Sequence, residues 1–496
     1  MRRSQGIALA LAMAGGAVSI WISAILYERI PHIEDEFAYL WEAHVMAAGE
    51  IAIPSPEEPG AFSVPFVIDF EGMRFGKYPP GWPAALSLGV RAGAPWIVNA
   101  ILSAAALWLI YRLGAKLLNP TVGLLAELLA LSSPMFIMLS GTLLSHMFAL
   151  FLTLVVLLAW IDLTRWNDED EAGKPVPRWM LVTTAGLALG LLILVRPLTA
   201  FGVAIPFGLH GALLLVRRAL APEKGIIMVG GITLLLAALL PTWQAAQSGD
   251  PSLNLYTLWW EYDRVGFGAG IGISPGGHNL LRGMGKSVWD LRAGLHDLFG
   301  SFSWIFLPFG WTALKKIKSG WLLLSIFPAL VFVYVLYWVG ATLFGPRYYF
   351  ESLPSLAITS AAGIAFVGGW LAQKTKPARW RKPLTVGLVS TLVLLNVHIY
   401  LPARLGMMQN LYNISKGRMQ SLEEAGLEGA LVIIDAGHWT DYGTLLTLTP
   451  PFKKDGFILA VSRGAAADHE LIAKYSPRPV FYYYADDPDT LYKAPR

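Results

Sequence analysis

The sequence predicts an all-α polytopic membrane protein that carries a small α/β domain at its C-terminal end. Of its 496 residues, 55% are hydrophobic and only 15% are charged, whereas soluble domains carry about 25% charged residues. Apolar stretches long enough to cross a bilayer recur from residue 6 to residue 402. Beyond them, short β-branched and aromatic runs alternate with helix-like segments, which is typical of an α/β domain.

About eleven stretches have the length of a transmembrane helix. They lie at residues 6–26, 94–111, 121–139, 145–163, 179–195, 198–216, 225–243, 300–314, 321–341, 350–371 and 384–402. Lys and Arg gather in every second connection, at 2–3, 112–116, 165–178, 217–224, 315–318 and 374–382. The positive-inside rule then predicts a multi-pass protein of the plasma (inner) membrane with a cytoplasmic N-terminus and an extracytoplasmic C-terminus. The loops 27–93 and 244–299 would be external.

The chain divides into a membrane module, residues 1–402, and an extracytoplasmic α/β domain, residues 403–496. Three runs in the second part have the length and composition of buried strands. They lie at 431–435, 457–461 and 480–484. Residues 421–426 and 465–475 are expected to be helical. About 95 residues are enough for a domain that folds alone.

Composition also excludes several kinds of site and partner. The chain has no Cys, which excludes disulfides, thiolate metal sites and cysteine nucleophiles. The net charge of +4 is small and unevenly spread, so it does not indicate a nucleic-acid partner. The partners expected from composition are therefore membrane lipids.

Three acids, Glu34-Asp35-Glu36, follow directly after the first apolar span. Carboxylates are unfavourable next to a bilayer, so their presence indicates a water-accessible reaction site at the membrane face. Asp35 and Tyr39 are four residues apart and share one face if the segment is helical. Asp35 as an ordinary helix N-cap is the alternative.

Arg196 and Arg347 depart from the charge rule, because each lies at an external helix end. Either arginine could extend to lipid headgroups instead. Since both are on the same side as the acidic cluster, they are better interpreted as ligands of an anion. Lys77 lies on this side too, in a proline-rich turn with Tyr78; the alternative is a solvated loop lysine.

Together these groups suggest displacement at a carbon that bears a phosphate leaving group. Carboxylates act as general bases or metal ligands, whereas Lys and Arg bind phosphate. The candidate residues are Asp35, Glu36, Tyr39, Lys77, Tyr78, His146, Arg196, Arg347 and Tyr348. His146, at the external start of a span, could equally be a buried histidine hydrogen-bonded to a neighbour.

The order of these motifs resembles the membrane-embedded GT-C glycosyltransferases, in the branch of protein O-mannosyltransferases and lipid A aminoarabinose transferases. The similarity covers roughly residues 5–400. It rests on Asp35-Glu36 with Tyr39 and Ala43 on a helix ending at Gly49, Lys-Tyr-Pro-Pro-Gly at 77–81, Arg196-Pro197, Arg347-Tyr348-Tyr349 and Leu353-Pro354.

The resemblance implies a polyprenyl-phosphate sugar as donor and an external protein, lipid or glycan as acceptor. Asp35 would be the catalytic base with Glu36 as its partner. Lys77, Arg196 and Arg347 would bind the donor phosphate. Substrate would also contact Tyr39, Tyr78, His146 and Tyr348. The implied reaction inverts the anomeric centre.

Many relatives carry an acidic residue where this chain has His146, which weakens a metal site there. No cofactor is certain, and a requirement for a divalent metal ion stays open because histidine also binds metals. The aromatic residues of loop 244–299 form either a cover for the acceptor or interfacial anchors. A transporter or flippase of lipid-linked sugars is the main alternative function, and a scaffold is a second. A transporter would place polar groups at mid-membrane depth on interrupted helices.

Overall fold

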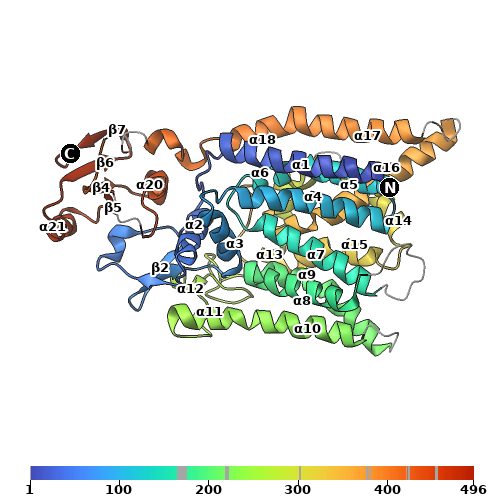
Figure 1. Ribbon diagram of the computed structural model, residues 1–496, viewed down its shortest axis with the longest axis horizontal. Coiled ribbons are helices and arrows are strands. Elements are labelled where there is room, and N and C mark those ends of the chain that lie inside the picture. Colours follow the sequence, from blue (N-terminus) through green and yellow to red (C-terminus); the bar gives the residue numbers. More distant parts are fainter. Residues whose placement is uncertain are drawn as a thin grey trace.

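The computed structural model describes residues 2–164, 176–217, 223–300, 303–375, 379, 381–419, 422, 425–452 and 456–496. Long helices form an elongated bundle, and the C-terminal strands lie beyond one end of it (Figure 1). This arrangement confirms the predicted fold class. The basic residues predicted at 165–175, 218–222 and 376–378, and most of the helix predicted at 421–426, lie outside the described residues.

Within the described ranges, eight helical segments are long and apolar enough to cross a membrane, and a bent pair would make a ninth. The eight are built from α1 (Arg2–Ile25), α4 (Ile97–Leu117), α7 (His146–Thr164), α8 (Arg178–Val195), α9 (Pro197–Val216), α10 (Glu223–Ala237) with α11 (Leu239–Ser248), α16 (Leu353–Thr375), and α17 (Arg381–Leu395) with α18 (Leu401–Met408).

The bent pair replaces the straight span predicted at 121–139. Helices α5 (Pro120–Leu131) and α6 (Pro134–Ser140) meet at 64°. Ser133 breaks the run because its hydroxyl caps α6 by accepting a hydrogen bond from the Phe136 N–H. Pro134 then occupies the first turn, where a missing N–H does no harm.

Two predicted spans are shorter than expected. Of the described residues in the stretch 300–314, only α14 (Leu307–Leu314) is an α-helix, and the stretch 321–341 overlaps with α15 (Gly320–Tyr334). Helix α15 stops at Tyr334 and leaves an irregular segment up to Arg347. This segment matters for function because it reaches the end of the bundle where the predicted site residues lie.

The first loop holds more structure than its sequence indicated. Helix α2 (Glu34–Ala47) was expected, but a small antiparallel sheet follows it, in the order β1-β3-β2. Its strands are β1 (Ile53–Pro54), β2 (Val67–Phe70) and β3 (Met73–Gly76). The β2–β3 hairpin turns at Glu71 and Gly72, both with positive φ, as a tight hairpin requires. Helix α3 (Gly81–Arg91) completes the loop.

The second long loop also contains helices. They are α12 (Tyr256–Trp259) and the 20-residue α13 (Leu280–Phe299). Between them lies a glycine-rich stretch with several positive φ values. The spacing of apolar residues did not predict α13, because the buried face of this helix carries small and polar residues such as Gly283 and Asp290.

The C-terminal part forms a four-stranded sheet in the order β5-β4-β6-β7. Strand β4 (Leu431–Asp435) pairs in parallel with β5 (Ile458–Val461) and β6 (Val480–Tyr484), which confirms the three predicted strands. Helix α21 (Ala465–Lys474) was also expected. Strand β7 (Asp487–Tyr492) and helix α20 (Trp439–Leu446) were not. The domain boundary at residue 402 stays a prediction.

Apolar residues of the sheet pack on both of its faces. Alternate residues of β4 point to two different clusters, Val432 and Ile434 to one, Leu431 and Ile433 to the other. The second cluster includes Ala61 from the first loop. The α/β part therefore packs directly on the loop that carries Asp35.

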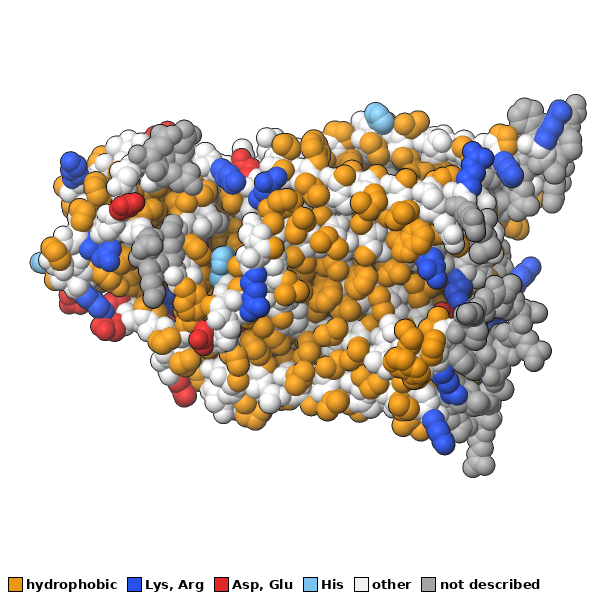
Figure 2. Space-filling model, viewed as in Figure 1, with side chains coloured by type: hydrophobic (Ala, Val, Ile, Leu, Met, Phe, Trp, Pro, Cys, Tyr) orange, Lys and Arg blue, Asp and Glu red, His pale blue; other side chains and the backbone are white. Residues whose placement is uncertain are grey.

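Acidic and basic side chains are distributed differently along the long axis. Figure 2 shows Lys and Arg at both ends of the molecule, whereas Asp and Glu lie mainly near the sheet, so the end of the bundle far from the sheet is predominantly basic. The helix ends on the side far from the sheet (Figure 1) carry Arg3, Arg112, Lys116, Arg178, Arg217, Lys224, Lys315, Lys316, Lys318 and Lys382.

Candidate functional site

A cavity of about 640 Å³ lies at the end of the helical bundle that faces the sheet. Eight of the nine predicted site residues line it, although they come from five separate segments of the chain. They are Asp35, Tyr39, Lys77, Tyr78, His146, Arg196, Arg347 and Tyr348. The structure therefore brings together residues that are more than 300 positions apart.

Asp35 is the second residue of α2, in its first turn, and the N-cap is Ile33. No side chain caps this helix, so the interpretation of Asp35 as an N-cap is wrong. Its carboxylate forms an ion pair with Arg347 (Oδ2 to Nη2, 3.5 Å) and accepts a short hydrogen bond from the Tyr78 hydroxyl. Because 22% of the side chain is exposed, the carboxylate can still reach a substrate.

Lys77 follows β3 and is almost fully buried, with 3% of its side chain exposed. It is therefore not a solvated loop lysine. Its Nζ lies 3.3 Å from the ring centroid of Phe66 and within 5.3 Å of three further rings, those of Tyr78, Tyr256 and Trp260. Aromatic faces attract cations. Burial lowers the pKa of Lys77 to about 8, against the opposing attraction of Asp35 and Asp263.

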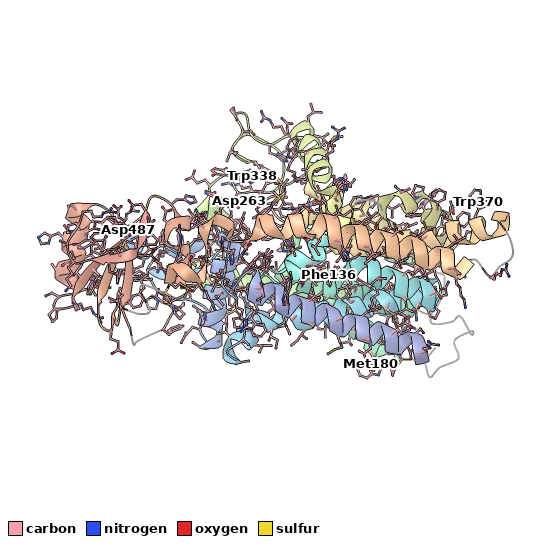
Figure 3. The ribbon with its side chains drawn as sticks, turned by 90° about the horizontal axis from the view of Figure 1, so that it is seen from above. Phe136, Met180, Asp263, Trp338, Trp370 and Asp487 are labelled. Carbon is pink, nitrogen blue, oxygen red and sulfur yellow. The ribbon has the colours of Figure 1, made fainter. Side chains whose placement is uncertain are left out.

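Asp263 is a site residue that the sequence did not reveal. Its Oδ2 lies 3.9 Å from Lys77 Nζ, and its Oδ1 accepts hydrogen bonds from Tyr337 Oη (3.0 Å) and Trp338 Nε1 (3.2 Å). Figure 3 shows Asp263 and Trp338 next to each other. A lone acid in an aromatic loop does not reveal, from the sequence, that it pairs with a distant lysine. Through its hydrogen bonds Asp263 joins the loop of α12 to the segment after α15.

Arg196 separates α8 from α9, where Pro197 starts the new helix. Its Nε lies 3.5 Å from Glu351 Oε1, and its Nη2 donates to the Tyr334 hydroxyl at 3.3 Å. Only 11% of the side chain is exposed. The guanidinium is thus directed into the protein, not toward lipid headgroups. Glu351, fully buried, was not expected from the sequence.

Arg347 has nitrogen donors that form no hydrogen bond with the described residues. Its Nη2 reaches Asp35, while Nε and Nη1 are buried and have no hydrogen-bond partner in the part of the chain that the structure describes. Both ring nitrogens of His146 are likewise buried and without a hydrogen-bond partner among the described residues. Buried polar atoms are normally hydrogen-bonded. These atoms are therefore available to a ligand, and a neighbouring side chain does not satisfy His146.

Glu36 lies outside the cavity, unlike the other predicted residues. Its Oε1 accepts from the Leu143 N–H (2.6 Å) and its Oε2 from the His32 N–H (2.8 Å). Burial raises its pKa to about 7. The side chain thus ties the start of α2, which carries Asp35, to the segment before α7.

An apolar arm extends from the polar part of the cavity. Its lining residues come from the ends of α8, α9 and α11. They are Val195, Pro197, Leu198, Phe201, Leu240 and Trp243. Phe201 is 57% exposed, so the arm reaches the outer surface of the membrane helices.

A metal ion has no evident set of ligands here. Among the described residues, no group of three or more His, Asp and Glu side chains is arranged to hold one. The nearest charged and polar partners of Asp35 are Arg347 and Tyr78.

Two kinds of solved protein share this fold. The chain is similar to the lipid A aminoarabinose transferase ArnT from Cupriavidus metallidurans, solved bound to undecaprenyl phosphate. The TM-score is 0.59 at 14% identity, over 96% of this chain and 92% of ArnT. It is also similar to the archaeal oligosaccharyltransferase AglB from Archaeoglobus fulgidus, solved with an inhibitory peptide and a dolichol-phosphate. There the TM-score is 0.53 at 13% identity, over 88% of this chain and 63% of AglB.

Both are glycosyltransferases of the GT-C fold, so the fold implied by the resemblance is confirmed. An oligosaccharyltransferase from Archaeoglobus fulgidus has also been solved with Zn and sulfate. No protein-family model matches the sequence, and no curated protein matches it.

Replacing Glu36 by Gln should destabilise the protein. A glutamine has one acceptor oxygen for two backbone N–H groups, so one buried donor is left unpaired, which costs about 1–3 kcal/mol. Thermal unfolding in detergent should show a lower midpoint than wild type, whereas Glu50→Gln, at an exposed position after α2, should not. An unchanged midpoint for Glu36→Gln would show that these two hydrogen bonds do not hold α2.

Proposed function

We propose that the chain transfers a sugar from a polyprenyl-phosphate-linked donor to an acceptor hydroxyl at the external face of the membrane. The observation that carries this proposal is one cavity that combines a partly exposed carboxylate, one buried and two largely buried cations, and an apolar arm. A lipid phosphate needs both parts, since its head is anionic and its tail is apolar. The solved complexes of ArnT and AglB with polyprenyl phosphates support it.

The donor phosphate binds among Lys77, Arg196 and Arg347. Arg347 offers two unpaired nitrogens, and a guanidinium can bind phosphate oxygens with a planar fork. Asp263 and Glu351 hold Lys77 and Arg196 in place at 3.9 Å and 3.5 Å, longer than a tight ion pair. Among the described residues, Arg196 donates to Thr199, Ser145 and Tyr334, which leaves one N–H on each of its two terminal nitrogens for an anion. The polyprenyl tail follows the apolar arm past Phe201.

Asp35 acts as the general base. It takes the proton from the acceptor hydroxyl while the hydroxyl oxygen forms a bond to the anomeric carbon. The bond from that carbon to the phosphate oxygen breaks, and its electron pair leaves with the polyprenyl phosphate. Attack opposite the leaving group inverts the anomeric centre. The cations stabilise the charge that develops on the phosphate.

Transport of a lipid-linked sugar is the second candidate. The bent pair α5–α6 is the kind of interrupted helix that transporters use. However, no residue of this pair lines the cavity. The ionisable residues gather instead at one end of the bundle, which favours chemistry at the membrane surface.

The distribution of charged residues supports the orientation expected from the sequence. Basic residues are enriched in the cytoplasmic connections of membrane proteins, and here the helix ends opposite the cavity carry Lys and Arg with few acids, whereas both signs occur near the sheet (Figure 2). We therefore assign the cavity and the C-terminal sheet to the external side.

Single cysteines test this orientation without background, because the chain contains no Cys. A membrane-impermeant maleimide added to spheroplasts should label Ala466→Cys, on the exposed surface of α21. It should label Lys316→Cys, at the basic end, only after the membrane is dissolved. The opposite pattern would contradict the external site.

Asp35→Asn should reduce transfer by a hundred- to ten-thousandfold, the range typical of general-base catalysis (about 10²–10⁴). Binding of undecaprenyl phosphate should persist, because the substitution removes a negative charge beside the phosphate. Transfer of radiolabelled sugar from purified donors into envelope extract measures the effect. Asp250→Asn, an exposed carboxylate away from the cavity, is the control. Full activity of Asp35→Asn would exclude Asp35 as the base.

The pH profile should report Lys77. Because its pKa is lowered to about 8, the cation is present below this pH and disappears as the pH rises through it. The value of kcat/KM for the donor should therefore fall above about pH 8. Lys77→Arg should extend the plateau to higher pH, whereas Asp263→Asn, which removes a neighbouring negative charge, should move the fall to lower pH. Identical profiles for all three proteins would reject Lys77 as the titrating group.

A further inference from the structure

A second, smaller cavity of about 200 Å³ adjoins the first. Three residues line both cavities: Glu34, Asp35 and Arg347. The ion pair of Asp35 with Arg347 thus forms part of the wall between them. A carboxylate in this position can face a donor in one cavity and an acceptor in the other.

The second cavity differs from the first in what lines it. The remaining lining residues are Ile33, Gly340, Ala341, Thr342, Leu343 and Tyr412. Four of them form one irregular segment after α15, which is held by two contacts. The Ala341 N–H donates to Asp290 Oδ2 (3.4 Å), and the Leu343 carbonyl accepts from Arg404 Nη2 (2.9 Å).

Tyr412 is the residue of the C-terminal part that lines this cavity. It has φ +57°, in the left-handed region, which is unusual for a bulky residue and marks a constrained position. Its ring is 44% exposed and meets Trp439 of α20 edge-on at 5.6 Å. Trp439 in turn contacts Phe37 of α2, two residues after Asp35, at 5.8 Å. The aromatic series therefore fixes Tyr412 relative to the base.

We propose that this cavity binds the acceptor, and that the acceptor group is a neutral sugar ring lying against Tyr412 with one hydroxyl directed at Asp35. This assignment rests on the proposed transferase function. It adds the side from which the acceptor arrives and the chemical class that fits there.

Size and charge favour a single neutral ring. A cavity of about 150 Å³ takes one benzene molecule, so about 200 Å³ holds one substituted six-membered ring. An anionic acceptor would meet two carboxylates, Glu34 and Asp35, against one guanidinium. A peptide is recognised along an extended strand or groove, which a cavity of this size does not provide.

Thr342→Trp tests the site by filling it. Thr342 lines the second cavity but not the first, and it is exposed, so an indole is tolerated there. Transfer of sugar into envelope extract should fall at least tenfold, while the Kd for undecaprenyl phosphate stays within twofold of wild type. Gln409→Trp, which is exposed and lines neither cavity, is the matched control. Wild-type transfer by Thr342→Trp would overturn the proposal.

Tyr412→Ala provides a second test that does not depend on tolerance of the indole. It should raise the KM for the acceptor about tenfold with a smaller effect on kcat, since the ring positions the acceptor and takes no part in proton transfer. Equal effects of Tyr412→Ala on donor and acceptor KM would overturn the acceptor assignment.

Competition identifies the acceptor class. Millimolar methyl glucoside should inhibit wild-type transfer into envelope extract, and N-acetylserinamide should not; the reverse result would overturn a sugar in favour of a peptide hydroxyl. If wild-type protein consumes no polyprenyl-phosphate sugar in the presence of extract, the transferase function itself fails. If it consumes the donor and Thr342→Trp does so equally, only the acceptor site fails.

Discussion

The burial of charged side chains beside a membrane is the constraint on which this site depends. An isolated buried charge is strongly unfavourable, so each must be paired or hydrogen-bonded. Asp35 is held by Arg347 and Tyr78, Lys77 by four aromatic rings and Asp263, and Arg196 by Glu351. These pairings order residues from distant segments before any substrate arrives. Preorganised charge of this kind is what stabilises a leaving phosphate effectively.

The same pairings explain what the sequence could and could not predict. Asp35, Lys77, Arg196 and Arg347 were recognisable because each breaks a local rule, either the rarity of charge near a bilayer or the positive-inside rule. Their partners Asp263 and Glu351 depart from neither rule, so the sequence alone does not single them out. Asp263 is one acid in an aromatic loop, and its contact with Lys77 arises only from the tertiary fold. Glu36 differs from these residues: adjacency to Asp35 suggested a shared role, but its carboxylate accepts two backbone N–H groups outside the cavity, and its catalytic role stays a prediction.

The fold shows a similar division. The long apolar helices and the three buried strands of the C-terminal sheet follow from composition and period, and they were predicted. Short helices such as α14, the bend at Ser133 and the β2–β3 hairpin depend on capping, proline and turn geometry over a few residues, which a hydropathy pattern does not resolve. The position of Tyr412 in the second cavity with Asp35 could not be predicted either, because it depends on the contact of Tyr412 with Trp439 from the C-terminal sheet region.

The position of a bound lipid phosphate is the decisive quantity. A structure of this protein determined with undecaprenyl phosphate should place the phosphate in the larger cavity, within hydrogen-bonding distance of Arg347 and at least one of Lys77 and Arg196, with the tail leaving past Phe201. Asp35 should lie on the opposite side of the sugar position. A phosphate bound elsewhere on the bundle, with this cavity empty, would contradict the account.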